Sequence, residues 1–216
     1  MKQITALRPG KGQTKRVRVS LDGKFAFSLE PEVVIQQDLE KGQALDETRI
    51  KELSRAGQFQ RCLDTARRQL SYRPRSEAEL RGRLRRQGYD DELREAVIVR
   101  LKEQGLVNDM AFTRFWVENR QTFSPRSQSL TRLELKKKGV ARDVIDQIAG
   151  SIDDEDSAYQ AARHRARRLP SLDYEGFRRR LFGYLKYRGF GIGVIRQAVA
   201  RVWQERQKEA VKTEES

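Results

Sequence analysis

The sequence predicts a mainly α-helical protein, built from three tandem three-helix repeats in an elongated array with a small α/β extension before them. The first indication is three glycines, Gly88, Gly139 and Gly189, spaced 51 and 50 residues apart. Each follows a leucine by four residues and precedes matching apolar positions. The tripeptide Pro-Arg-Ser at 74–76 recurs 51 residues later at 125–127. Because units of this length bury too little apolar surface alone, we expect them to stack.

Residues 1–57 are expected to form the extension, which begins with β-strands. Apolar and polar residues alternate on both sides of Asp22-Gly23, and this pattern predicts a hairpin. Residues 3–8 are a candidate third strand. Two helices should follow, one opened by Pro31 and one near 46–55, because proline fits the first turn of a helix.

The length of the hairpin loop decides which side chains share a face of the sheet. The apolar residues on the two strands are Val17, Val19, Phe25 and Phe27. A two-residue loop would turn the valines away from the phenylalanines. A three-residue loop at 21–23, with Gly23 left-handed, brings all four onto one face. We therefore expect the three-residue loop.

The repeats are expected at 58–106, 107–156 and 157–206, followed by a polar tail at 207–216. Each repeat should hold three helices, and its middle helix should end at the repeated glycine in a left-handed cap. The polar sequence from Gln204 onward should fray.

Helix starts are marked by capping residues. Ser76, with Glu79 three residues later, has the pattern of a capping box. Asp90 or Asp91 should cap the third helix of the first repeat, and Asn108-Asp109 the helix after it. These signals fix where the helices begin.

The middle repeat departs from the pattern at one core position. Thr131 stands where Leu80 and Leu181 stand in the other repeats. We expect the apolar face of this helix to be slightly rotated as a result.

The chain contains little that could carry catalysis. His164 is its only histidine and lies in a strongly basic helix, where a surface position is expected. Cys62 is its only cysteine, and a buried small side chain is the expected role. The acidic run 153–156 could hold a metal, but a helix N-terminus also favours carboxylates, and we expect capping. The sequence thus predicts a non-enzyme without metal or cofactor.

The cysteine content and the lengths of the apolar stretches indicate the cellular compartment of the protein. A single cysteine allows no internal disulfide, which is typical of a reducing cytosol. The first residues lack the apolar core of a secretory signal, and no stretch approaches the roughly 18 apolar residues that span a membrane. We expect a cytoplasmic protein without a membrane partner.

A surplus of positive charge indicates a polyanionic partner. The chain has 45 Lys and Arg against 31 Asp and Glu, a formal net charge of +14. The surplus gathers in and around the middle helix of each repeat, and stacking should merge the clusters into one stripe whose attraction is salt-sensitive and independent of base sequence. The residues of this predicted basic stripe are Arg73, Arg75, Arg81, Arg83, Arg85, Arg86, Arg126, Arg132, Lys136, Lys137, Lys138, Arg178, Arg179, Arg180, Lys186 and Arg188.

Aromatic residues are interleaved with the third cluster. They are Phe182, Tyr184 and Tyr187. Stacking on exposed bases is one possible role. Core packing is the expected role of Phe182.

Short motifs occur along the chain in a specific order and spacing. The run 70–76 (LSYRPRS) is followed by Gly88-Tyr89, and the run LKEQGLVND stands at 101–109. The turns KGV and RGF follow at 138–140 and 188–190. Together these motifs resemble the first repeat, the junction into the second repeat and the later turns of the RecX family, whose members regulate the RecA recombinase. The N-terminal strands and helices resemble the long form of the family.

The resemblance implies a non-enzymatic regulator whose three three-helix units form a curved body. Such proteins bind the RecA–single-stranded DNA filament along its groove and limit its growth and activity, although some stimulate it. A monomeric protein acting on RecA and single-stranded DNA is therefore expected. The alternatives are a stand-alone, sequence-independent DNA-binding protein, which shares the basic stripe, and a nuclease, which would need a metal at 153–156.

Overall fold

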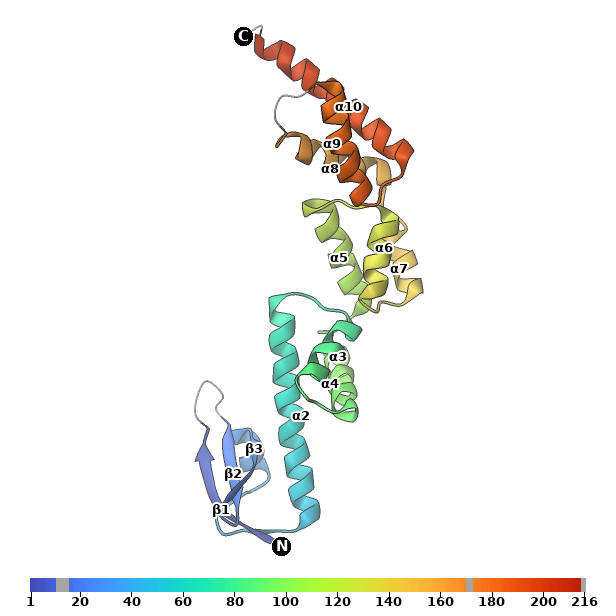
Figure 1. Ribbon diagram of the computed structural model, residues 1–216. Helices are drawn as coiled ribbons and strands as arrows, with labels where there is room; N and C mark the ends of the chain where they lie inside the picture. The colour runs from blue at the N-terminus through green and yellow to red at the C-terminus, as the bar shows by residue number, and fades with distance from the viewer. Residues whose placement is uncertain (11–15, 170–172, 215–216) are drawn as a thin grey trace. The chain divides into compact units, whose positions relative to one another are not determined.

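The computed structural model describes residues 1–10, 16–169 and 173–214. Within these ranges the chain forms ten helices and four strands (Figure 1). The helices divide into three three-helix repeats after a small N-terminal sheet, which confirms the predicted fold class. Two compact units are present, one made of Met1–Arg73 and Leu80–Leu106, the other of Pro74–Glu79 and Val107–Ser216.

The N-terminal sheet has four antiparallel strands in the order β3-β2-β1-β4. They are β1 (Lys2–Pro9), β2 (Val17–Leu21), β3 (Lys24–Leu29) and β4 (Ala44–Leu45). The candidate strand at 3–8 is thus confirmed as β1, whereas β4 had no signal in the sequence. One face buries Ile4, Val19 and Phe27, each at most 2% exposed, and forms the core of the extension.

The predicted three-residue hairpin loop is wrong. Leu21 pairs with Lys24, so the loop is Asp22-Gly23 alone, and both residues have positive φ (48° and 79°) as a type I′ turn requires. The register then shifts, because Val19 pairs with Phe27 while Ser20 pairs with Phe25. This bulge at Ala26 returns Phe27 to the buried face and leaves Phe25 51% exposed on the other.

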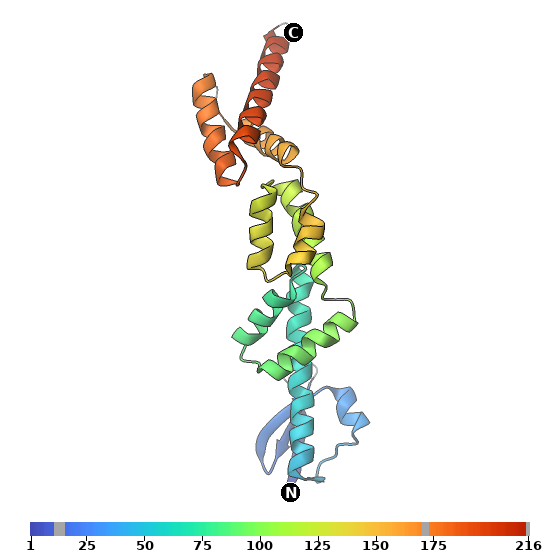
Figure 2. The ribbon, with the colours of Figure 1, turned by 90° about the vertical axis from the view of Figure 1, so that its right-hand side faces the viewer.

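Two helices follow the sheet, as predicted. The helix α1 (Pro31–Gln36) opens with its proline, and α2 (Glu47–Tyr72) begins at Asp46, whose carboxylate accepts from the Arg49 N–H at 2.7 Å. At 26 residues, α2 continues well past the expected end near 55 and serves both the extension and the first repeat (Figure 2). A Cβ at Gly57 would overlap the Ser28 carbonyl oxygen, so glycine allows α2 to lie directly on β3.

The middle helices end in the predicted left-handed caps. They are α3 (Glu77–Arg86), α6 (Gln128–Lys137) and α9 (Tyr174–Tyr187). Gly88, Gly139 and Gly189 have φ of 84°, 75° and 87°. After each glycine the next N–H returns to the buried leucine of the last turn, as Val140 does to the Leu135 carbonyl at 3.2 Å. One local motif therefore closes all three helices.

Asp and Asn side chains cap several of the remaining helices. The remaining helices are α4 (Asp91–Glu103), α5 (Asp109–Phe123), α7 (Arg142–Ala149), α8 (Asp154–Ala166) and α10 (Ile192–Glu214). Asp90 caps α4 by accepting from the Leu93 N–H at 2.8 Å. Asn108 caps α5 through the Met110 and Ala111 N–H groups. Both predicted caps are confirmed.

The expectation that the chain frays from Gln204 is wrong, because α10 continues to Glu214. Contacts beyond Gln204 hold it. The Tyr159 hydroxyl donates to the Glu205 carboxylate at 3.0 Å, and the Arg206 guanidinium lies 5.6 Å from the centre of the Phe177 ring. Long polar side chains can anchor the end of a helix beyond its apolar stripe.

The expected rotation of the middle repeat is also wrong. Thr131 is fully buried, as are Leu80 and Leu181 at the equivalent positions. Leu133 nearby is 46% exposed. The threonine simply takes the core position, and its Oγ1 has no hydrogen-bond partner in the described part of the chain.

Within the described residues of the whole chain, no helix is long and apolar enough to cross a membrane.

Candidate interface for a polyanionic partner

The candidate catalytic residues occupy structural positions. His164 is exposed in the last turn of α8, and Cys62 is buried, with a thiol pKa raised to about 12 chiefly by that burial. Asp153 caps α8 by accepting from the Glu155 N–H at 2.8 Å, as predicted. Among the residues with described positions, no three His, Cys, Asp or Glu side chains are grouped as a metal site would require.

Basic residues lie along the three middle helices and at their ends. The last turns contain Arg85 and Arg86 in α3, Lys136 and Lys137 in α6, and Lys186 in α9. Cations are favourable there because the C-terminal end of a helix carries partial negative charge. Local helix energetics therefore support these positions without any partner.

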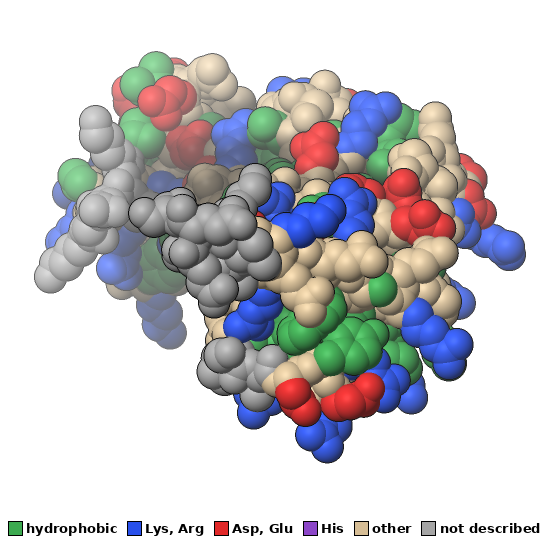
Figure 3. Space-filling model, turned by 90° about the horizontal axis from the view of Figure 1, so that it is seen from above, with side chains coloured by type: hydrophobic (Ala, Val, Ile, Leu, Met, Phe, Trp, Pro, Cys, Tyr) green, Lys and Arg blue, Asp and Glu red, His purple; other side chains and the backbone are tan. Residues whose placement is uncertain are grey.

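Half of the predicted basic stripe is exposed to solvent. Lys and Arg side chains project among acidic and apolar ones on the face drawn in Figure 3. One exposed member, Arg178, forms an ion pair with Glu175 on the same helix at 2.7 Å. Solvent screens this pair, so it contributes little to stability. The exposed residues are Arg85, Arg86, Lys136, Lys137, Arg178, Arg179, Arg180 and Lys186.

The other half is partly or fully buried. In the first unit, Arg81 binds Glu95 through two hydrogen bonds of 2.6 and 3.0 Å, and Arg83 donates to Gln69 at 3.1 Å. In the second repeat, Arg132 pairs with Asp146 at 2.9 Å.

Two further members lie beside the start of α3. Arg75 is only 6% exposed, and Arg73 is half-buried. Sequence alone did not distinguish any of these residues from the exposed cations.

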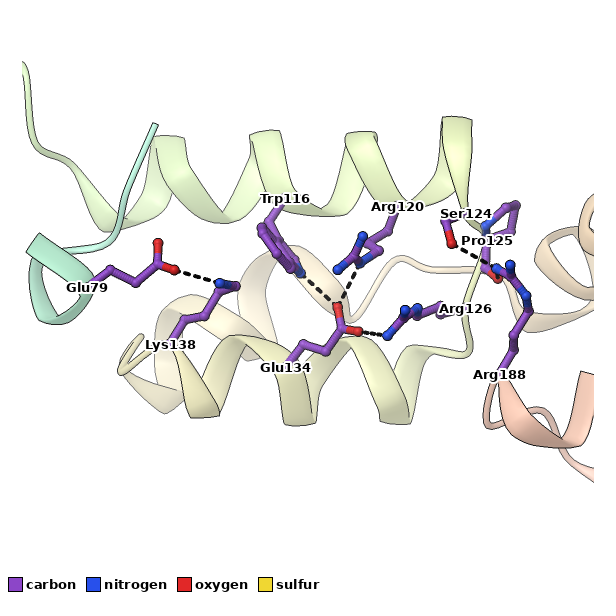
Figure 4. A network of polar contacts seen from close by, with 9 residues as sticks. All are labelled: Glu79, Trp116, Arg120, Ser124, Pro125, Arg126, Glu134, Lys138 and Arg188. Atoms are coloured by element: carbon purple, nitrogen blue, oxygen red, sulfur yellow. Dashed lines mark hydrogen bonds and ion pairs between the residues drawn. The ribbon is translucent and has the colours of Figure 1, made fainter. Parts of the chain in front are cut away.

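Another residue of the predicted basic stripe, Arg126, binds a carboxylate inside the second repeat (Figure 4). Glu134 is 14% exposed and accepts from Trp116 Nε1 at 3.0 Å, from Arg120 Nε at 2.8 Å and from Arg126. Burial lowers the pKa of both arginines, and Arg120 adds to the effect on Arg126. One buried anion thus satisfies two guanidinium groups and an indole, which ties α5 to α6.

Lys138 and Arg188 link one repeat to the next. The Lys138 ammonium binds the Glu79 carboxylate at 2.7 Å and lies 4.1 Å from the centre of the Trp116 ring. Arg188 donates to the Ser124 hydroxyl at 3.0 Å and to the Pro125 carbonyl at 2.8 Å (Figure 4). Both side chains therefore serve the repeat junctions.

The groove between α9 and α10 combines basic and aromatic side chains. It has a volume of about 790 Å³, and its walls include Arg178, Arg179, Tyr174 and Phe182. Phe182 also packs on the core of the third repeat, as expected. Arg196 completes the groove from α10. Arg196 lies outside the basic clusters that the sequence places on the middle helices, so it was missed.

Four family models match the chain in order. They describe the RecX N-terminal domain (residues 2–46) and the first, second and third RecX three-helix domains (62–101, 108–148 and 153–199). The two outermost matches together include the sheet and the first part of α10, so the resemblance extends over most of the fold.

Curated relatives and solved structures agree with the models. The chain is 29% identical to regulatory protein RecX of Bacillus velezensis, over 96% of this chain and 80% of that one. It is 27% identical to that of Clostridium perfringens, over 94% and 97%, and 38% identical to that of Amycolatopsis mediterranei, over 58% and 73%.

The fold also matches a crystal structure of regulatory protein RecX, with a TM-score of 0.63 and 24% identity over 92% of this chain and 98% of that one. RecX from Lactobacillus salivarius gives a TM-score of 0.54 and 20% identity over 67% and 96%. Fold, repeat order and family models lead to one conclusion: this chain belongs to the RecX family of regulatory proteins.

Proposed function

We propose that the protein regulates RecA by binding the RecA–single-stranded DNA filament through the exposed basic residues of its middle helices. One observation carries the proposal. Arg85, Lys136 and Lys186 occupy equivalent positions in three successive repeats, and all three are exposed. A polymer of repeated subunits on a phosphate backbone offers negative charge at repeated intervals, and periodic cations complement it.

The proposed action needs no catalysis. A single copy would contact neighbouring RecA subunits in the filament groove and hinder filament extension, strand exchange and the cleavage of repressors that RecA promotes. Because the contacts are charge pairs, binding should weaken with salt and depend little on base sequence. We place the protein in the cytoplasm, with its partner.

The division of the basic residues into exposed and structural groups sharpens the test. The triple variant Arg85→Glu, Lys136→Glu, Lys186→Glu removes the periodic cations without touching the repeat junctions. The matched control is Lys2→Glu, Lys41→Glu, Lys51→Glu, which makes the same charge change at exposed positions of the first unit. Circular dichroism should show both variants folded.

The measurement is DNA-dependent ATP hydrolysis by RecA on single-stranded DNA, titrated with each variant at two salt concentrations. We expect inhibition by the wild type and the control, and its loss in the interface variant. Equal inhibition by both variants would place the interface elsewhere. Binding to the same DNA without RecA separates the alternative, because inhibition only where bare DNA is saturated indicates a simple DNA-binding protein.

A further inference from the structure

The first unit contains a second basic concavity, between the outer face of the sheet and α2. Its volume is about 430 Å³. Arg18 and Phe25 line it from β2 and β3, and Arg61 and Arg68 line it from α2. None of these residues belongs to the predicted basic stripe, and all lie in one compact unit.

The hairpin bulge creates an exposed aromatic surface in this concavity. Because the bulge sends Phe27 to the core, Phe25 is left on the outer face with 51% of its surface exposed. The Arg18 guanidinium lies 4.8 Å from the centre of the Phe25 ring. An unpaired base can stack on an exposed aromatic ring or on a guanidinium plane.

The charge around Phe25 and Arg18 is unbalanced. Among the described residues, Asp64 is the only carboxylate lining the concavity, and it is already bound to Arg16 and Gln60. Arg18, Arg61 and Arg68 form no ion pair with any residue in the described ranges. Three guanidinium groups are therefore available to phosphate oxygens beside an aromatic face.

We propose that this concavity binds single-stranded DNA, with a base stacked on Phe25 and Arg18 and the phosphates held by Arg61 and Arg68. A nucleic acid fits better than an acidic peptide, because aspartate and glutamate side chains supply carboxylates for the guanidinium groups but no flat ring to stack on Phe25. The proposed site depends on the proposed function only because the RecA filament would present single-stranded DNA to it. Its test needs no RecA.

Stacking is tested with two fluorescent hexanucleotides, one of thymidine and one with abasic spacers in place of the bases. We expect Phe25→Ala to weaken binding of the thymidine oligomer roughly 5- to 100-fold in fluorescence anisotropy, the usual effect of losing one stacked base. Binding of the abasic oligomer should not change. Phe25→Leu, which keeps apolar volume without an aromatic face, should behave like Phe25→Ala, and Phe25→Tyr like the wild type.

The phosphate contacts are tested through salt dependence. The variant Arg61→Ala, Arg68→Ala should weaken binding of both oligomers and reduce the slope of log K against log salt by about 1.4, since each phosphate contact on a single strand contributes roughly 0.7. The matched control, Lys41→Ala, Lys51→Ala, removes the same charge from the same unit and should leave the slope unchanged. Circular dichroism confirms that each variant is folded.

Three results would overturn the site. One is thymidine binding that survives Phe25→Ala in a folded protein. Another is an equal effect of that change on the abasic oligomer. The third is displacement of the oligomer by hexaglutamate at similar concentration, which would indicate a site for acidic peptides. If oligomer binding depends on Phe25 while RecA inhibition fails, the site stands and the proposed filament interface falls.

Discussion

Ser76 donates its hydroxyl to the carbonyl oxygen of Lys138 at 2.6 Å, across 62 residues of sequence. The next junction repeats the contact in a related form, since the Ser127 N–H donates to the Arg188 carbonyl at 3.1 Å. In both cases the start of one middle helix meets the end of the middle helix one repeat later.

A second pair of bonds recurs at the same junctions. Asp109 accepts from the Glu77 N–H at 2.8 Å, and Asp154 accepts from the Gln128 N–H at 2.6 Å. These carboxylates accept hydrogen bonds from N–H groups that have no partner within the helix, at the start of the preceding repeat's middle helix. The 51- and 50-residue spacing of the glycines thus reflects a junction that is built twice in the same way.

The junction glycines should be intolerant of a side chain. A Cβ at Gly139 would overlap the Ala78 Cβ, and its positive φ alone costs an L-residue about 1–2 kcal/mol. Gly139→Ala should therefore destabilise the protein by more than that amount in urea unfolding followed by circular dichroism. Ala78→Gly in the same chain should recover part of the loss, and strictly additive effects would show that the two positions are not in contact.

Thr131→Val should stabilise the middle repeat. The threonine hydroxyl is buried without a hydrogen-bond partner in the described residues, and valine has nearly the same shape. Removing an unsatisfied polar atom is expected to add about 1 kcal/mol to the free energy of unfolding. Thermal unfolding should show a higher Tm. Thr131→Ser, which keeps the hydroxyl and opens a cavity, should lower it.

Loss of the buried carboxylate should be much more damaging than loss of an exposed one. Glu134→Ala leaves Arg120 and Arg126 without their anion in a poorly solvated site, at a cost of about 3 kcal/mol. Glu95→Ala removes the partner of Arg81 at a half-exposed position and should cost less than about 1 kcal/mol. Urea unfolding of the two variants compares them directly, and similar losses would contradict the role of Glu134.

The buried thiol predicts a pH dependence. Burial raises the pKa of Cys62 from its ordinary 9.0 to about 12, so the folded chain keeps a proton that the unfolded chain loses. The stabilising contribution is complete below pH 9 and is lost as the pH rises towards 12. Each pH unit in that window should remove about 1.4 kcal/mol from the wild type relative to Cys62→Ala. Parallel pH curves for the two proteins would mean that the thiol ionises normally.

Local signals in the sequence predicted the helices well. Caps such as Asp90 and the three left-handed glycines depend on residues a few positions away, so their effects are visible in the sequence itself. The fate of the basic residues depends on distant partners. Lys137 and Lys138 are neighbours of the same charge, yet only Lys138 reaches Glu79, 59 residues away. The sequence therefore identified a basic middle helix but not which of its cations remain exposed.

The hairpin illustrates the same difference. The Asp22-Gly23 turn is a local signal, but the bulge at Ala26 satisfies a core that also needs β1 and α2. No residue pattern within the hairpin indicates this bulge. For that reason Phe25 was assigned to the buried face, and the concavity it lines had no counterpart in the sequence prediction.

The repeated junction bears on how such a chain could arise and change. The first two repeats carry a serine at the start of the middle helix, and all three carry a glycine turn at its end. A tandem duplication of about 50 residues would therefore supply a new copy with matching donors and acceptors on both sides. Growth or loss of whole repeats therefore requires no new contact chemistry.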